Sequence, residues 1–136
     1  MKKKKFWLWL LLTLVWVTVI FWHSARTAEE SDAVSLGLLA YIQKVLPFMT
    51  NHLLRKAGHF AEFAILGWLM TKSFSLCKNF ILLKPLAFSL IVALCDETIQ
   101  LFVPGRSGAV MDVWIDFAGA AVGALLLRLL LEIRKR

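Results

Sequence analysis

The chain has 136 residues, 60% of them hydrophobic, and a mean hydropathy of +0.72. A soluble domain of this size needs a polar exterior, and this composition leaves too few polar side chains to build one, so it favours a membrane protein. The net charge of +7 does not indicate nucleic acid as a partner, because the Lys and Arg residues gather at the ends of apolar segments rather than along one soluble face. Membrane lipids with anionic head groups are the expected partners instead.

The first apolar segment covers residues 6–22 and follows a run of lysines. A basic start before an apolar stretch is also typical of a signal peptide, but this segment is longer than the usual apolar part of one and contains four Trp. The Trp side chains near both of its ends suit the two membrane interfaces. We therefore predict a transmembrane helix that is kept in the mature protein.

Residues 23–55 form the longest polar stretch of the chain. Three acids near its start lead into apolar residues at helical spacing, and this pattern continues as far as Pro47. It is too short and too polar to span a bilayer, so it predicts an amphipathic helix that lies in the membrane interface. Thr50 is placed to cap the helix that follows. We expect His23 and His52, which lie in this outer region, to be solvated or interfacial.

Three further apolar segments cover residues 56–73, 85–103 and 112–131, and each is long enough to span a bilayer as a helix. Pro104 stops the second of these three, because proline cannot continue a helix. The sequence therefore predicts an all-α, single-domain, polytopic membrane protein over residues 1–136. It would be a bundle of four transmembrane helices, with the interfacial amphipathic helix between the first and the second.

The basic residues predict how this bundle is oriented. The amino terminus, the loop between the second and third segments and the carboxyl end carry most of the Lys and Arg residues, whereas the loop between the third and fourth carries only Arg106. Under the positive-inside rule, both termini then lie in the cytoplasm. We expect a multi-pass protein of the cytoplasmic (plasma) membrane whose two longer connections face outward.

Ionisable side chains within membrane segments are costly, and they indicate a functional site by default. Because the helices run in alternating directions, polar residues near the start of one and near the end of the next are expected at the same depth. The residues at this level are Lys56, His59 and Glu62 in the second segment, Asp96, Glu97 and Gln100 in the third, and Asp112 and Asp116 in the fourth.

The fourth segment also carries a packing signal. Gly119 and Gly123 have the GxxxG spacing, which lets a neighbouring helix approach closely. Steps of four, three and four residues place them on the same helical face as Asp112 and Asp116. We therefore expect these aspartates to point into the bundle.

Arg106 lies in a short loop where two glycines bracket it. Glycines permit a tight turn, and an Arg held on such a turn above an acidic cluster could grip a phosphate or carboxylate with two parallel hydrogen bonds. The alternative is that Arg106 neutralises one of the nearby acids, Asp96, Glu97 or Asp112. Both interpretations are compatible with the sequence.

Three interpretations of the whole cluster stay open at this level. In the first, it is an interhelical network in which Lys56, His59 and Arg106 balance the acids and hold the helices in register. The chain would then be a structural or partner-binding membrane protein without enzymatic activity. Polar contacts in membranes contribute only about 0.6 kcal/mol on average, so several carboxylates are a costly way to hold helices together.

In the second interpretation, the cluster binds or modifies an anionic lipid or glycan-lipid head group, such as that of a cell-wall precursor. The residues that would bind the head group are Lys56, Gln100, Arg106, Asp112 and Asp116. If the protein is an enzyme, the pairs that would transfer protons are His59 with Glu62, or Asp96 with Glu97.

In the third interpretation, the cluster holds a divalent metal ion as a cofactor. The candidate ligands offer nitrogen and oxygen atoms suited to such an ion, and they are His59, Glu62, Asp96 and Asp116. No nucleophile elbow, phosphate loop, CxxC or HExxH pattern occurs in the sequence, so no particular reaction is indicated.

Several short motifs, taken together, are more specific than any one of them alone. They are the Lys-Ala-Gly-His-Phe-Ala-Glu-Phe run of residues 56–63 with Leu66-Gly67, the Asp-Glu-Thr-Ile-Gln run of residues 96–100, residues 102–106, Asp112, Asp116, and the small-residue face from Gly119 to Gly123. In this combination the chain resembles the VanZ-like family of small membrane proteins over roughly residues 10–130. The member that gives the family its name is associated with resistance to teicoplanin, a lipid-bearing glycopeptide antibiotic. The resemblance thus implies the four-helix fold and a cell-envelope setting, and it suggests antibiotic resistance without implying a reaction.

Overall fold

The computed structural model describes residues 2–77 and 80–134, and within these ranges it is all-helical, as predicted. The five helices are α1 (Lys2–Ser24), α2 (Ala28–Ile42), α3 (Asn51–Phe74), α4 (Leu83–Leu101) and α5 (Val110–Ile133). Each predicted transmembrane segment corresponds to one helix, and the predicted interfacial helix corresponds to α2.

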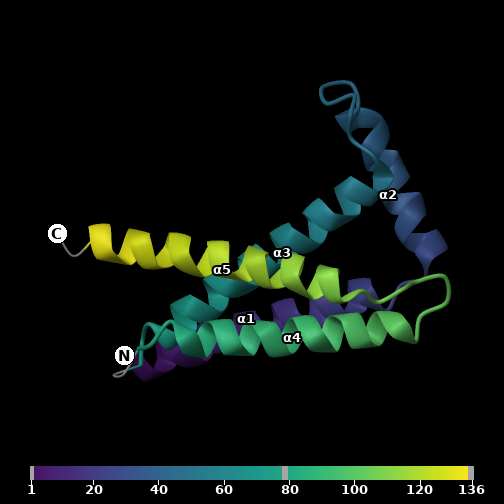
Figure 1. The fold of residues 1–136 in the computed structure, drawn as a ribbon. Coiled ribbons are helices and arrows are strands. Elements are labelled where there is room, and N and C mark those ends of the chain that lie inside the picture. Colours follow the sequence, from purple (N-terminus) through teal and green to yellow (C-terminus); the bar gives the residue numbers. More distant parts are fainter. Residues whose placement is uncertain (1, 78–79, 135–136) are drawn as a thin grey trace.

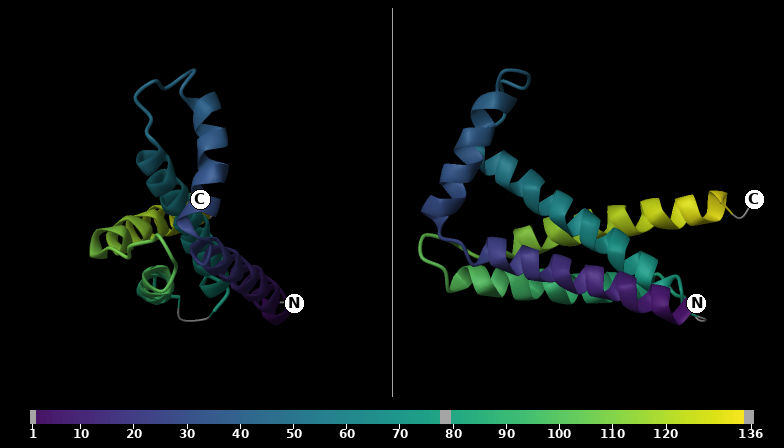
Figure 2. Two further views of the ribbon diagram at one scale, coloured as in Figure 1. Left: turned by 90° about the vertical axis from the view of Figure 1, so that its right-hand side faces the viewer. Right: turned by 180° about the vertical axis from the view of Figure 1, so that it is seen from behind.

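The helices α1, α3, α4 and α5 pack together, whereas α2 projects from this bundle and the chain returns from its tip to the start of α3 (Figure 1). The second helix contacts chiefly α3. The start of α1, the end of α3, the start of α4 and the end of α5 lie at one end of the molecule (Figure 2). The opposite end therefore carries the residues that the sequence places at the outer level of the bundle.

Local capping explains where two helices begin. The side chain of Thr50 accepts a hydrogen bond from the backbone N–H of Leu53, so the predicted cap of α3 is confirmed. Thr27 and Glu30 form a reciprocal capping box at the start of α2. Each cap satisfies backbone N–H groups that the first turn of a helix leaves without partners.

The closest contact in the bundle is the crossing of α3 and α5. A β-carbon added at Gly119 or Gly123 would overlap a backbone carbonyl oxygen of α3, at Phe60 and Ala64 respectively. Gly67 of α3 lies against the backbone of α5 in the same way. The predicted close approach along the glycine face of α5 is confirmed, and α3 contributes a glycine of its own to it.

Burial in this bundle is inverted with respect to a soluble protein. Asp96, Asp116 and Ser89 are fully buried, whereas Leu129 and Phe88 are 55% and 49% exposed. Many other large apolar side chains on the outer faces of the helices are exposed as well. Such a surface is expected where the outside of the bundle faces lipid rather than water.

Among the described residues, two helical stretches are long and apolar enough to cross a membrane, namely Lys3–Ser24 and Val110–Ile133. The other two predicted spans, residues 56–73 and 85–103, correspond to α3 and α4, which carry most of the ionisable residues of the cluster. Four transmembrane helices are therefore not established by length and hydropathy, and the four-span topology stays a prediction.

Candidate functional site

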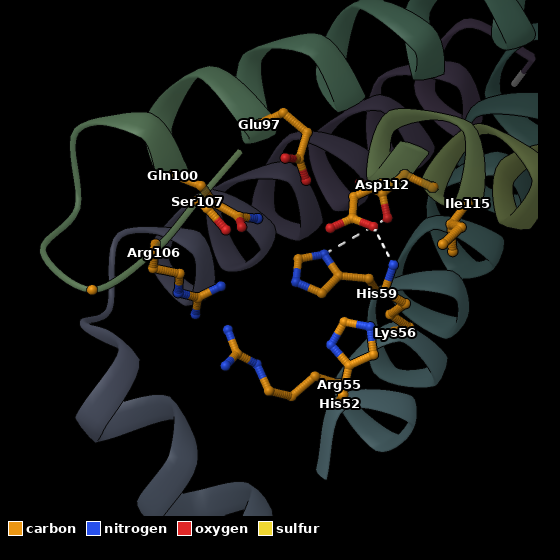
Figure 3. A pocket seen from close by; sticks show the side chains of 12 residues that line it. His52, Arg55, Lys56, His59, Glu97, Gln100, Arg106, Ser107, Asp112 and Ile115 are labelled. Carbon is orange, nitrogen blue, oxygen red and sulfur yellow. Dashed lines mark hydrogen bonds and ion pairs between the residues drawn. The ribbon is translucent and has the colours of Figure 1, made fainter. Parts of the chain in front are cut away.

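A cavity of about 160 Å³ lies between α3, α5 and the connection from α4 to α5, and we name it the α3–α5 cavity (Figure 3). Seven of the nine predicted site residues line it: Lys56, His59, Glu97, Gln100, Arg106, Asp112 and Asp116. The side chains that complete its lining are His52, Arg55, Ser107 and Ile115, together with Gly105. Residues predicted from three separate segments thus share one cavity.

A buried trio of ionisable side chains lies at this cavity. His59 Nδ1 is 3.7 Å from Asp96 Oδ2 and 3.7 Å from Asp116 Oδ1, and both aspartates are fully buried. The Asp96 carboxylate accepts hydrogen bonds from Ser24 Oγ at 2.5 Å and from Gln100 Nε2 at 3.1 Å. Neither carboxylate oxygen of Asp116 has a hydrogen-bond partner among the described residues. Both aspartates therefore face the interior of the bundle, as predicted, and lie beside the same histidine.

The other predicted acids each have a distinct partner. Asp112 Oδ1 lies 2.7 Å from Lys56 Nζ, which joins α5 to α3. The Glu97 carboxylate accepts a hydrogen bond from the backbone N–H of Ala109 at 2.9 Å and so anchors the start of α5. Asp96 instead faces α1, through Ser24. Adjacent acids of α4 therefore have different surroundings.

Glu62 and Asp96 are the two predicted residues that do not line the α3–α5 cavity, and Glu62 also lies outside the buried trio. Its Oε1 atom lies 2.6 Å from His23 Nδ1, so its carboxylate pairs with the end of α1 rather than with His59. We expected His23 to be solvated or interfacial, and its side chain is 41% exposed. Its contact with Glu62 nevertheless makes His23 part of the site. This contact joins two different helices, so the spacing of residues within one segment could not predict it.

Arg106 is held by the backbone at the end of α1, by the backbone of the loop between α1 and α2, and by a side chain of α2. Its Nε atom donates to the carbonyl of Arg26 at 3.2 Å, and its Nη2 atom donates to the carbonyl of His23 at 3.3 Å and to Ser31 Oγ at 2.7 Å. The predicted tight turn is present, because Gly105 has a φ of 75°. Within the described part of the chain Arg106 makes no direct ion pair with Asp96, Glu97 or Asp112, although its charge still acts on Asp96 and Glu97, so the alternative that it neutralises an acid of the cluster stays open.

Arg55 is a site residue that the sequence interpretation missed. Its guanidinium and that of Arg106 point toward each other at the cavity, as Figure 3 shows. Burial, followed by the positive charge of Arg55, lowers the pKa of Arg106, although a guanidinium stays charged at neutral pH. Arg55 also lies 3.2 Å from Asp32 Oδ1. The sequence did contain a signal for Arg55, because this residue lies one helical turn before His59 and therefore on the same face of α3.

A second, larger cavity of about 460 Å³ lies between α2 and α3, and we name it the α2–α3 cavity. Its apolar wall is formed by Val34, Leu38, Leu54 and Ala57. The polar residues that line it are His23, Arg26, Ser31, Ser35, Arg55, His59, Glu62 and Arg106. Arg55, His59 and Arg106 line both cavities. The polar α3–α5 cavity and the more apolar α2–α3 cavity therefore meet at these three side chains.

Three of the four predicted metal ligands lie close enough together to be candidates for binding one ion. His59, Asp96 and Asp116 present ligand atoms that all lie within 4.8 Å of one another. Glu62, the fourth predicted ligand, is outside this group and bound to His23.

Comparison with known proteins supports the resemblance seen in the sequence. The family model described as VanZ/LLP1 matches residues 8–131, a stretch that includes every predicted site residue. No curated protein and no solved structure matches the chain. Family membership and the two apolar helices indicate a membrane protein of the cell envelope. Because the match extends over nearly the whole chain, the protein belongs to the VanZ/LLP1 family.

Proposed function

We propose that this protein binds an anionic amphiphile of the cell envelope, a phosphate-bearing lipid or glycan-lipid, at the outward face of the cytoplasmic membrane. The observation that carries the proposal is the convergence of Arg55 and Arg106 where the two cavities adjoin. Two like charges repel each other, and an anion between them would relieve this repulsion. Guanidinium groups bind phosphate with two parallel hydrogen bonds, so phosphate is the anion that suits the pair best.

The shape of the site supports an amphiphile rather than a free anion. The α2–α3 cavity offers an apolar wall next to the guanidinium groups, so an alkyl chain could lie along α2 and α3 while its head group occupies the α3–α5 cavity. Lys56 and Gln100, which line that polar cavity, could donate further hydrogen bonds to the head group. Small-ligand sites commonly combine apolar walls with a few such polar groups.

A four-span topology supports the placement of this site in the membrane. The 24 residues of α3 and the 19 of α4 correspond to helices about 36 Å and about 28 Å long, close to the thickness of a bilayer core of about 30 Å. The outer face of α4 exposes Phe88, Ile91 and Leu94, whereas Asp96 and Glu97 are buried. The ionisable residues that lower the hydropathy of α4 thus face protein rather than lipid.

The charge distribution supports an outward orientation of the site. The start of α1, the end of α3, the start of α4 and the end of α5 lie opposite the site (Figure 2). The described basic residues in or next to these stretches are Lys3, Lys4, Lys5, Lys72, Lys84, Arg128 and Arg134. The positive-inside rule places this end, and with it both termini, in the cytoplasm. Both cavities then open toward the outside of the cell, with α2 in the outer interface.

Cysteine labelling tests this topology. Cys77 is exposed at the proposed cytoplasmic end. In a Cys95→Ser variant, a membrane-impermeant maleimide should label Cys77 only after the cells are permeabilised. In a variant that also carries Cys77→Ser and Ser107→Cys, the same reagent should label intact cells. The reverse pattern would place the termini outside, and equal labelling in intact and permeabilised cells for both variants would contradict the four-span topology.

Lipid binding tests the proposed function. Purified protein should bind phosphatidylglycerol more tightly than phosphatidylcholine when bound lipids are counted by native mass spectrometry. Arg106→Gln and Arg55→Gln should each weaken phosphatidylglycerol binding by about 10- to 100-fold, because a hydrogen bond to a charged group contributes about 1.5–3 kcal/mol. Arg128→Gln is the matched control, since Arg128 is exposed and pairs with Glu132 at the far end of the bundle.

Equal affinity for the two lipids, or an equal loss in the Arg128→Gln control, would contradict the proposal. A polyprenyl phosphate used as a second probe distinguishes a cell-wall lipid carrier from a bulk membrane lipid. Selective binding of this probe would favour a role in resistance to teicoplanin-type antibiotics, because a protein that engages cell-wall precursors or lipids at the outer leaflet can alter the access of a lipid-bearing glycopeptide.

A structural role is the second candidate, and it rests on contacts that join helices. Lys56 with Asp112 connects α3 to α5, and Ser24 with Asp96 connects α1 to α4. In this case Arg55→Gln should lower stability in detergent without changing the preference for phosphatidylglycerol. Ligand selectivity, rather than stability, therefore separates the two functions.

A further inference from the structure

Within the buried part of the site, polar atoms lack partners. His59 Nδ1, Asp116 Oδ1 and Asp116 Oδ2 are inaccessible and have no hydrogen-bond partner among the described residues. Asp116 is fully buried. Buried polar atoms are nearly always satisfied, so these three atoms point to a bound species between the side chains.

The donor atoms are arranged around one point. His59 Nδ1 lies 3.7 Å from an oxygen of Asp96 and 3.7 Å from an oxygen of Asp116. Ligand atoms of a tetrahedral zinc ion, each about 2.0–2.1 Å from the metal, lie about 3.3 Å from one another. All three donor atoms lie within 4.8 Å of one another, so they would have to move closer by up to about 1.5 Å to reach that spacing.

Charge balance favours a cation at this point. The Lys and Arg side chains nearest to Asp96 and Asp116 are engaged elsewhere: Lys56 pairs with Asp112, and Arg106 donates to the end of α1, the α1–α2 loop and α2. A divalent ion would balance two ionised aspartates and so offset the cost of burying them.

The surroundings also resemble the outer shell of a metal site. Ser24 Oγ and Gln100 Nε2 donate hydrogen bonds to Asp96 and hold its carboxylate in place. Outer-shell partners of this kind orient metal ligands. His59 and Asp116 both line the α3–α5 cavity, so a remaining coordination position would face that cavity.

From these observations we infer that His59, Asp96 and Asp116 bind a divalent transition-metal ion, with Zn²⁺ as the ion that fits best. Three protein ligands with one open position are typical of zinc sites that take a further ligand. A histidine nitrogen among the donors argues against Mg²⁺, which prefers oxygen ligands only. The open position lies in the cavity that Arg106 also lines, so the ion could contact a bound head group, but metal binding does not depend on lipid binding.

Metal content of the full-length protein tests the inference. The purified protein in detergent is first treated with a chelator and then dialysed against Zn²⁺. It should then contain one zinc ion per chain, as measured by inductively coupled plasma mass spectrometry. Co²⁺ loaded in its place should give the visible absorption of a tetrahedral nitrogen and oxygen site. Both readouts use the unaltered chain, so they do not depend on any variant that could fail to fold.

Variants then test the ligand set. Asp116→Asn and His59→Gln should each weaken Zn²⁺ binding by at least about 100-fold, more than the 10- to 100-fold expected for loss of an outer-shell partner. Asp112→Asn is the matched control, because this aspartate lies one turn from Asp116 and already pairs with Lys56. It should keep one zinc ion per chain.

Unaltered protein that holds no zinc and gives no cobalt spectrum would overturn the inference. Loss of zinc in Asp112→Asn to the same extent as in Asp116→Asn would overturn the assigned ligands. Failure of lipid selectivity together with normal zinc content would contradict only the proposed lipid function.

Discussion

Replacement of Gly123 by alanine is expected to lower the free energy of unfolding by about 3 kcal/mol or more. The new methyl group would overlap the backbone carbonyl oxygen of Ala64, and a backbone atom in the middle of α3 cannot turn aside as a flexible side chain can. The two helices would have to separate along their whole crossing. Overpacking a tight contact typically costs about 1–3 kcal/mol, and a clash with backbone lies at the upper end or beyond. Gly67→Ala should have a similar effect from the other helix, at Ala120.

Titration with sodium dodecyl sulfate in mixed micelles measures these unfolding free energies. Gly37→Ala is the matched control, because no atom lies within 4 Å of a β-carbon at this position of α2. Alanine favours a helix over glycine by about 0.8–1.0 kcal/mol, so this control should be neutral or slightly more stable. If Gly123→Ala were as stable as Gly37→Ala, α3 and α5 would not cross at these glycines.

Replacement of Ser24 by alanine is expected to cost about 1–3 kcal/mol or more of unfolding free energy. Ser24 Oγ donates to the fully buried Asp96, and alanine removes only this hydroxyl group without adding atoms at a buried position. Loss of a donor to a buried charged group leaves that group unsatisfied, which costs more than an ordinary hydrogen bond contributes. The effect should therefore exceed that of removing an exposed hydroxyl from the same helix.

Thr18→Val provides that comparison. The Thr18 hydroxyl donates only to the carbonyl of Leu14 on an exposed face of α1, so its loss should change stability by less than about 0.5 kcal/mol. The same detergent titration measures both variants. Equal effects of Ser24→Ala and Thr18→Val would mean that the hydrogen bond between α1 and α4 contributes nothing to the fold.

The two proposals assign different tasks to neighbouring residues. Arg55 and Arg106 would bind an anion where the two cavities adjoin, while His59, Asp96 and Asp116 would hold a metal ion at the inner end of the polar one. A phosphate bound to both the guanidinium groups and the ion would combine the tasks. Such an arrangement would strengthen the binding of a lipid phosphate, because a metal ion can stabilise charge on the phosphate oxygens.

The sequence alone determined the helical segments and which residues of each helix share a face. These properties depend on hydropathy, on helical period and on distance along one helix, and all three can be counted within a segment. The same counting placed Asp116, Gly119 and Gly123 on one buried face of α5, and the structure confirms this. The family resemblance followed from the same residues, and the match over residues 8–131 confirms it.

Only the tertiary structure decided which partners these residues have. His23 contacts Glu62, and Ser24 contacts Asp96, because α1 packs against both α3 and α4, and neither contact leaves a periodic signal in the sequence. The closeness of Arg55 and Arg106 likewise depends on tertiary structure, because the α4–α5 loop brings Arg106 back over the start of α3. Periodicity assigns each side chain to a face of its own helix, whereas the choice of the facing helix depends on packing between distant segments, such as the glycine contacts that fix the crossing of α3 and α5.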